Sequence, residues 1–370
     1  MASRTKSSTI QVAFLVTFLS THGIFSDDTL PIPADKAQLD TWFNENVGPL
    51  DQRKSTIDPK LVVAEEGAKV VKVMKDGSGQ FKTITDAINH IPTGNTKRVI
   101  VHIGPGNYNE KIKIDRTKPF ITLYGVPENM PNLTFGGTAQ QYGTIESATL
   151  IVGSDYFVAA NIIISNSAPR PDGKKPGAQA VALRISSDKA TFYNCKVFGF
   201  QDTVCDDKNR HFFKDCLIQG TMDYIFGSAK SLYLNNELRT LGNDNEATVI
   251  VAQARKSEAK DSVYSFVHCD ITGTGTNTYL GRAWMPHPKV VFAYTNMSSV
   301  VKKEGWSNNM HPEYEKSVRF GEYQNKGPGA DPNGRSPLAK QLSDEEVKPY
   351  ITLDLIEGSK WLLPPPTPKV

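Results

Sequence analysis

A repeat of just over twenty residues constrains the fold of this chain more than any other feature of its sequence. Each copy has an aromatic-rich run, a small or polar residue and then alternating aliphatic residues. The copies are TFYNCKVFGF (191–200), HFFKDCLIQG (211–220), SLYLNNELRT (231–240), YSFVHCDITG (264–273) and VFAYTNMSSV (291–300). Short strands at this period, with no helix between them, predict a parallel β-helix whose stacked coils bury each other's apolar faces.

Cysteines and asparagines mark the register of the repeat. Cys195 and Cys216 are 21 residues apart, and Asn236 follows 20 residues later. Cys269 and Asn296 continue the series at wider spacing, as expected where loops are inserted into individual coils. A β-propeller or a β-sandwich is the alternative, but the turns at intervals of about 8–12 residues that such folds need are not evident.

Strand-like runs extend beyond these copies, and only two segments have a helical pattern. Strands are expected within 98–104, 120–126, 149–167 and 289–297. A helix is expected over FKTITDAINHI (81–91), where it would cap the open N-terminal end of the β-helix and cover its strand edges. The second helical segment is LSDEEVKPYI (342–351).

The N-terminal region differs from the repeat region. Arg4 and Lys6 precede the apolar run IQVAFLVTFL, a pattern typical of a secretory signal peptide, which we expect to occupy residues 1–26. Residues 27–65 are polar and weakly patterned, and are expected to form a leader to one β-helix domain over residues 66–370. No other stretch is long and apolar enough to cross a bilayer, so we expect a secreted protein without a membrane anchor.

Composition narrows the range of partners and cofactors. The net charge of +3, with both signs interspersed, is too balanced to indicate nucleic-acid binding. The four cysteines form no C-x-x-C pair, so a zinc site is not expected. Two sequons, at Asn132 and Asn296, fit N-glycosylation of a secreted chain.

The stretch QDTVCDDKNRHFFKDCLIQGTMD (201–223) contains the candidate chemistry. Asp202 lies seven residues after Cys195 and Asp223 lies seven after Cys216, so the repeat places the two aspartates one above the other in successive coils. Stacked carboxylates repel, which raises one pKa relative to the other and divides the pair into a proton carrier and an ionised partner. The alternative is a purely structural polar ladder, since aspartate also suits tight turns.

Other polar residues of this region divide into two groups. Gln179 precedes Gln201 by 22 residues, close to one further period, so the two glutamines should join the aspartates on one face. Asp206 and Asp207 belong to a run typical of a solvated turn, and Asp215 occupies a strand position in register with Asn194. For these three aspartates we expect a structural role.

Several segments together resemble the plant pectin methylesterases, the pectinesterase family. They occur in the order of that family: DGSGQFKTITDAI (76–88), GNYNEKI (106–112), QAVALRISSDKATFYNC (179–195), GFQDTV (199–204), GTMDYIFG (220–227), YLGRAW (279–284), FGEYQNKGPGA (320–330) and WLLP (361–364). The resemblance implies an all-β, right-handed parallel β-helix. It also implies hydrolysis of the methyl ester on galacturonate units of pectin, with release of methanol.

The resemblance assigns roles by matching motifs. Asp223 would be the nucleophile that forms an acyl-enzyme anhydride, and Asp202 would protonate the leaving methanol and then activate water. Gln179 and Gln201 would stabilise the oxyanion with their amide N–H groups. No metal or organic cofactor is needed for this chemistry.

Two more residues and the partners follow from the same resemblance. Arg282 in LGRAW would hold Asp223 ionised and oriented, and Trp284 would stack on a sugar ring, although by themselves they would be read as a surface arginine and a core tryptophan. The expected substrate is homogalacturonan pectin in the cell wall, and a proteinaceous pectinesterase inhibitor is a candidate partner. We expect a monomer.

The chain departs from the family pattern at several positions. Phe200 and Cys205 stand where many plant members have tyrosine, and the second position is expected to line the substrate cleft. The family's usual disulfide partner of Cys216 is replaced by Asn236, which leaves a link from Cys195 to Cys216 as the open alternative. The short segment before the β-helix leaves no room for the helical inhibitor-like pro-domain.

Two alternatives to an esterase stay open on the sequence. Polygalacturonases and pectate lyases share the β-helix and the polymer, and stacked carboxylates would also suit a glycosidase. The glutamines beside the aspartates favour ester chemistry, because acyl transfer creates an oxyanion that needs donors. A non-catalytic wall-binding relative is the second alternative, and the intact set of polar residues argues against it.

Overall fold

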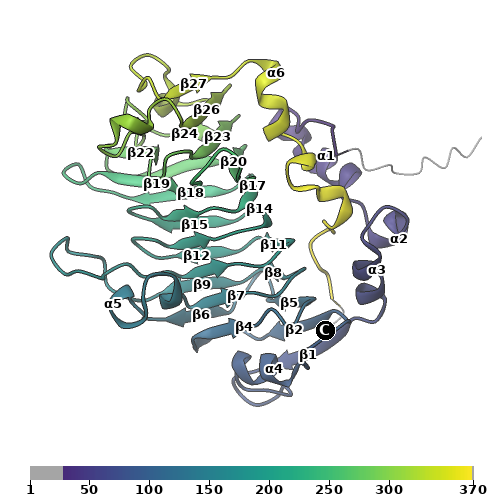
Figure 1. Cartoon of the computed structure of the whole chain (residues 1–370). Coiled ribbons are helices and arrows are strands. Elements are labelled where there is room, and N and C mark those ends of the chain that lie inside the picture. The colour runs from purple at the N-terminus through teal and green to yellow at the C-terminus, as the bar shows by residue number, and fades with distance from the viewer. Residues whose placement is uncertain (1–27, 369–370) are drawn as a thin grey trace, which may run out of the picture.

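The strands form a parallel β-helix with three sheets. The computed structural model describes residues 28–368, and within them every pairing between the named strands of the three sheets is parallel. In Figure 1 the coils stack from the N-terminal end at the bottom to the C-terminal end at the top. The predicted fold is confirmed.

Each coil from β2 to β25 contributes one strand to each sheet, and β1, β26 and β27 extend the first sheet alone. The first sheet contains β1 (Lys69–Val73), β2 (Val99–Ile103), β5 (Ile121–Tyr124), β8 (Val158–Ala160), β11 (Ala190–Tyr193), β14 (Arg210–Lys214), β17 (Lys230–Leu234), β20 (Val263–Val267), β23 (Lys289–Ala293), β26 (Arg319–Tyr323) and β27 (Ala339–Gln341). The second sheet contains β4 (Ile112–Ile114), β7 (Leu150–Val152), β10 (Leu183–Ile185), β13 (Val204–Asp206), β16 (Ile225–Gly227), β19 (Thr248–Gln253), β22 (Thr278–Arg282) and β25 (Trp306–Ser307). The third sheet contains β3 (Asn107–Asn109), β6 (Asn132–Phe135), β9 (Ile163–Asn166), β12 (Lys196–Phe198), β15 (Leu217–Gly220), β18 (Glu237–Leu241), β21 (Asp270–Thr274) and β24 (Asn296–Met297).

The interior contains a column of stacked aromatic rings. Neighbouring rings in successive strands of the first sheet have centroids 4.5 to 4.7 Å apart. The column consists of Phe192, Phe213, Tyr233, Phe266 and Phe292, all of them fully buried. The aromatic positions of the repeat therefore point into the helix, where each coil completes the packing of the next.

A left-handed residue ends most strands of the first sheet and turns the chain into the third. These residues have φ between 47° and 58°: Asn161, Asn194, Asp215, Asn235, His268, Tyr294 and Gln324. The pairing of Asp270 with Asn296 places Thr295, and not Asn296, in register with Cys269. The predicted series of cysteines and asparagines is therefore wrong by one residue at its last member, because the intervening loop changes the spacing.

The predicted capping helix is α4 (Ile84–His90). Its buried residues Ile84, Ala87 and Ile88 belong to the same core as the strands of the first coils. The Thr83 side chain caps the helix, and the carboxylate of Glu110 accepts hydrogen bonds from the backbone of Ile84 and Thr85. The helix thus closes the N-terminal end of the core.

Helices outside the β-helix are more numerous than the sequence pattern predicts. The segment predicted as a leader contains α1 (Leu39–Asn46), α2 (Leu50–Arg53) and α3 (Pro59–Glu66), and a loop carries α5 (Ala139–Tyr142). The second predicted helix is short, with α6 (Asp344–Val347) followed by 3₁₀ turns at Lys348–Tyr350, Leu353–Ile356 and Gly358–Lys360. Further 3₁₀ turns are Lys36–Gln38, Ile145–Ser147, Pro312–Tyr314 and Pro328–Ala330. No helix within residues 28–368 is long and apolar enough to span a membrane.

The two terminal segments pack together on the outer face of the first sheet (Figure 1). Trp42 and Phe43 of α1 share an apolar cluster with Phe212 and Leu232 of the sheet and with Trp361 of the C-terminal segment. The first sheet is therefore buried on both faces over much of its length. The predicted signal peptide lies outside the described residues.

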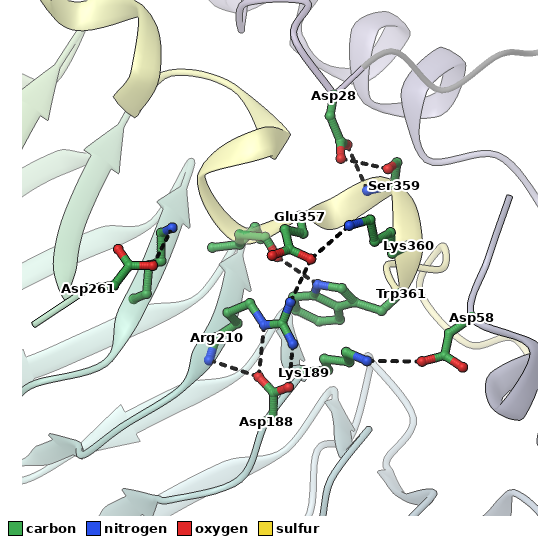
Figure 2. Close-up of polar contacts among 12 residues, drawn as sticks. Asp28, Asp58, Asp188, Lys189, Arg210, Asp261, Glu357, Ser359, Lys360 and Trp361 are labelled. Carbon is green, nitrogen blue, oxygen red and sulfur yellow. Dashed lines mark hydrogen bonds and ion pairs between the residues drawn. The ribbon is translucent and has the colours of Figure 1, made fainter.

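Polar contacts fasten one terminal segment to the other. The fully buried Arg53 donates to the carbonyl oxygens of Leu362, at 2.7 Å, and Ser359. The Asp28 carboxylate accepts from the backbone and hydroxyl of Ser359 at 2.7 and 2.6 Å (Figure 2).

Candidate active site

The two stacked aspartates occupy equivalent turns of successive coils. Asp202 precedes β13 and Asp223 precedes β16, and these strands pair with Val204 opposite Ile225. The N–H of Asp202 donates to the carbonyl of Met222 at 3.0 Å. Both aspartates have left-handed backbone, with φ of 65° and 51°, a conformation that aspartate tolerates better than most residues.

Burial and mutual repulsion separate the two carboxyl groups electrostatically. Asp202 is 9% exposed and Asp223 is 6% exposed. Burial, and then the charge of Asp223, raise the pKa of Asp202 well above its usual range. Burial also raises the pKa of Asp223, but two hydrogen bonds from Arg282 stabilise its ionised form and oppose that rise. Asp202 is therefore the more readily protonated member of the pair and Asp223 the more readily ionised one.

The planar guanidinium group of Arg282, the last residue of β22, donates two hydrogen bonds to the Asp223 carboxylate. Its Nε donates to Oδ1 at 2.8 Å and its Nη2 donates to Oδ2. The remaining Nη1 donates to Oδ1 of Asn309 at 2.7 Å. Sequence reasoning missed Asn309. Its only signal is that asparagine tolerates the left-handed backbone, with φ of 55°, that it adopts here.

The two glutamines lie in adjoining coils but are staggered. The N–H of Ala180 donates to the carbonyl of Gln201 at 3.2 Å, and β10 pairs with β13 at an offset that aligns Gln201 with Ala180. The spacing of 22 residues therefore places Gln179 one residue away from exact stacking. Both side chains are half-buried, and neither amide group forms a hydrogen bond with any residue of the described range.

Trp284 stands at the solvent-facing side of the arginine. Its side chain is 46% exposed, and its ring centroid lies 4.9 Å from the guanidinium carbon of Arg282. The indole is therefore a surface platform next to the buried acids, and not part of the core.

The expectation of a solvated turn is wrong for Asp206. The strand β13 continues through this residue and turns its side chain into the interior, where it is fully buried. One carboxylate oxygen contacts Nδ1 of His211 and the other accepts from the Tyr233 hydroxyl at 2.7 Å. Its carbonyl accepts from Tyr264 at 2.6 Å. Its role is structural, as expected, but within a buried polar network.

Asp207 and Asp215 lie outside the candidate site. The Asp207 carboxylate accepts from the hydroxyl of Ser186 at 2.7 Å and pairs with Arg184 at 3.3 Å. Asp215 is exposed at a left-handed turn, in register with Asn194 as predicted.

The cysteines are buried free thiols. Cys205 packs against Phe226 and small aliphatic residues at 2% exposure, so it does not face the cleft, and burial raises the pKa of its thiol. Cys195 and Cys216 lie in adjoining coils, with the Cys195 N–H donating to the Cys216 sulfur at 3.4 Å. Asn236 accepts from the Cys216 N–H at 2.7 Å.

The two sequon asparagines differ in their surroundings. Asn132 lies half-buried in β6, donates to Asn107 at 2.9 Å and accepts from Ser165 at 2.9 Å. Asn296 is exposed at the start of β24. Within residues 28–368, no group of three or more His, Cys, Asp or Glu side chains is arranged to hold a metal ion.

Comparisons with known proteins agree with this geometry. The family model described as Pectinesterase matches residues 70–359. Pectinesterase 2 of Olea europaea is 58% identical over 92% of this chain and 93% of its own length, and putative pectinesterase 63 of Arabidopsis thaliana is 52% identical over 96% and 97%. The solved structure of pectin methylesterase from carrot superposes with a TM-score of 0.74 at 28% identity, covering 81% of this chain and 97% of that one. With its β-helix and these similarities, the chain belongs to the pectinesterase family.

Proposed function

We propose that this chain hydrolyses the methyl esters of galacturonate units in pectin and releases methanol, with Asp223 as nucleophile and Asp202 as acid and base. Membership of the family supports de-methylesterification of pectin. The observation that carries the assignment of residues is the buried pair of carboxyl groups in successive turns, of which only Asp223 accepts hydrogen bonds from Arg282, while burial and the Asp223 charge raise the pKa of Asp202.

The reaction proceeds in two steps. The Asp223 carboxylate attacks the ester carbonyl, and the tetrahedral intermediate collapses as the methoxide leaves with the proton of Asp202. This gives methanol and an anhydride between the galacturonate and Asp223. Water then attacks the galacturonate carbonyl of the anhydride while Asp202 takes its proton, which releases the galacturonate and restores both groups.

The two glutamines supply donors for the oxyanion. Their amide groups are not engaged by residues of the described range, so the N–H groups of Gln179 and Gln201 are available to a ligand. Preorganised donors of this kind typically contribute about 3–4 kcal/mol of transition-state stabilisation each. Trp284, exposed beside Arg282, offers an apolar face on which a sugar ring of the polymer can stack.

The proposed secretion of the protein and its proposed partners rest on arguments from the sequence. We propose that the chain is secreted to the cell wall after removal of residues 1–26, which N-terminal sequencing of the mature protein would test. N-glycosylation would then be expected at Asn296, which is exposed, rather than at Asn132, which is half-buried. A proteinaceous inhibitor and a monomeric state remain predictions.

The decisive experiment follows methanol and new chain ends together. The wild-type protein should release methanol from methylesterified pectin without producing reducing or unsaturated ends. Asp223→Asn and Asp202→Asn should each lower kcat at least about 1,000-fold. Asp215→Asn, which makes the same change at a left-handed turn of the coil that joins them, is the matched control and should remain fully active. Unchanged methanol release by Asp223→Asn would refute the assigned nucleophile.

A further inference from the structure

Cationic side chains recur at one register position of the first sheet, where its strands begin. Arg210 is aligned with Lys230, and Lys289 is aligned with Arg319. Extending the pairings by one residue gives the column Lys189, Arg210, Lys230, Val263, Lys289 and Arg319. Because paired strands are about 4.8 Å apart, this cation column is a row of cationic side chains along the β-helix axis, interrupted at Val263.

The chain's own carboxylates already bind one end of the cation column. Asp58, at the start of α3, pairs with Lys189 at 3.0 Å. Glu357 of the C-terminal segment pairs with Arg210 at 2.9 Å, and Asp188 pairs with the same arginine (Figure 2). The terminal segments thus contact the column through carboxylates. We infer from this that the column binds carboxylate groups.

The other end of the column, from Lys230 to Arg319, is called the open end. Lys230 pairs there with Asp261 and Arg319 with Glu258, each at 3.0 Å, but cations around them have no carboxylate partner in the described part of the chain. Lys208 and Lys289 form no ion pair with any residue from 28 to 368, and Lys260 donates only to the hydroxyl of Ser228. Lys208 and Lys260 are exposed, and Lys289 is half-buried. Three ammonium groups therefore lack a carboxylate partner on one face of the molecule.

A buried arginine adds to this excess. Arg255 is 7% exposed, and its guanidinium group donates only to the backbone carbonyls of Glu258, Lys260 and His287. Carbonyl groups satisfy its hydrogen bonds but do not cancel its charge. Burial lowers the pKa of Lys289, and the positive charge of Arg255 lowers it further, so an anion beside Lys289 would relieve this repulsion.

Two hollows follow the open end. One, of about 420 Å³, is lined by Lys208, Arg210, Lys230 and Lys260 together with three acidic residues. The other, of about 460 Å³, is lined by Lys289, Arg319 and Lys340, with Glu346 paired to Lys340 and Tyr350 in its wall. The ammonium of Lys289 lies 5.6 Å from the Tyr350 ring centroid, so charge and an aromatic surface occur together.

We propose that the open end of the cation column binds a stretch of de-esterified polyuronate outside the catalytic cleft. This inference rests on the proposed function, since such a chain is the product of that reaction. A linear polymer with one carboxylate per sugar matches a row of cations, whereas a methyl ester carries no charge and gains nothing there. Asp202 precedes the strand β13 and the column follows it, so the two sites lie at opposite ends of the strands of the second sheet.

A binding experiment with charge-matched variants tests the proposal. The probes are fluorescently labelled polygalacturonate and its fully methylesterified form, at low and high salt. Lys208→Ala/Lys289→Ala should bind polygalacturonate about tenfold more weakly than wild type at low salt. Lys82→Ala/Lys326→Ala removes the same charge from two exposed positions, one beside the capping helix α4 and one beside the third sheet, and should bind like wild type. Both should retain wild-type kcat on a short methylesterified oligogalacturonide.

Equal affinity of the two double variants for polygalacturonate would overturn the proposal, because binding would then reflect net charge or the cleft alone. The methylesterified polymer is tested with Asp223→Asn, which should not convert it. An affinity of this variant for the methylesterified polymer as strong as its affinity for polygalacturonate would also overturn the proposal. Absence of methanol release by the wild-type protein would instead refute the proposed function, so the two failures can be told apart.

Discussion

Arg282 holds both carboxylate oxygens of Asp223 across an intervening strand. The arginine ends β22 and the aspartate precedes β16, with β19 between them in the second sheet. Two strand spacings amount to about 9.6 Å, a gap that only a long side chain can bridge. The pair therefore fixes the position of the proposed nucleophile relative to two coils at once.

Replacing this arginine by lysine should impair the reaction even though the charge is kept. Arg282→Lys loses the planar two-point contact, and we expect kcat to fall about 100-fold. Because Arg282 opposes the burial that raises the pKa of Asp223, the acidic limb of kcat/KM should also move to higher pH. A pH profile of methanol release measures both effects.

A second arginine provides the matched control. Arg239 pairs with Glu237 on the third sheet, with Nε donating at 2.9 Å, and both side chains are partly exposed. Arg239→Lys should leave kcat and the pH profile unchanged. An Arg282→Lys variant with reduced kcat but an unshifted acidic limb would contradict the electrostatic role and leave only a positioning role.

Asp202 should make the folded state less stable as the pH rises. Burial and the charge of Asp223 raise its pKa in the folded state above the unfolded value, so the folded state binds this proton more tightly. The resulting stabilisation is complete below the unfolded pKa and is lost as the pH rises through the folded pKa.

Asp202→Asn removes this titration. The unfolding midpoint of the variant, minus that of wild type, should therefore increase between about pH 4 and the folded pKa of Asp202. Thermal unfolding followed by circular dichroism at successive pH values gives this difference. A difference that stays constant, or that decreases with pH, would argue against a raised pKa.

The sequence predicted the features that depend on period and missed those that depend on what packs against what. Asp202 and Asp223 could be aligned because the coil between them contains no inserted loop and has the length of one repeat. Asn309 could not be found, because its contact with Arg282 depends on the path of an irregular loop. The helix α1 was missed because it is short, and its Trp42 and Phe43 are buried only by the outer face of a sheet formed much later in the chain.

The burial of Asp206 could not be predicted either, although the residue lies in a regular coil, because DDKNR has the composition of a solvated turn. Its side chain instead joins a buried network. Nε2 of His211 faces the carbonyl of Ser187 at 2.9 Å and donates to it, while Nδ1 contacts the Asp206 carboxylate.

Removing Asp206 should therefore be costly, and a neutral isostere should be tolerated far better. Asp206→Ala leaves buried polar atoms of His211 and Tyr233 without a hydrogen-bond partner. It should reduce the free energy of unfolding by about 3–5 kcal/mol. In Asp206→Asn, the amide can donate to Nδ1 and still accept from the tyrosine, so the loss should be much smaller. Urea unfolding of both variants makes the comparison, and equal losses would show that an amide cannot replace the carboxylate in this network.

The aromatic column should be most sensitive at its middle. Phe266 stacks on Tyr233 at 4.5 Å and on Phe292 at 4.6 Å, and it is fully buried. Phe266→Ala removes both contacts and leaves a cavity between coils, which should lower the free energy of unfolding by about 3–5 kcal/mol. Phe266→Leu keeps most of the volume but neither stacking contact, and should lose less. If the two variants unfolded at the same urea concentration, filling of the interior would matter little and the coils would be held chiefly by their backbone ladders.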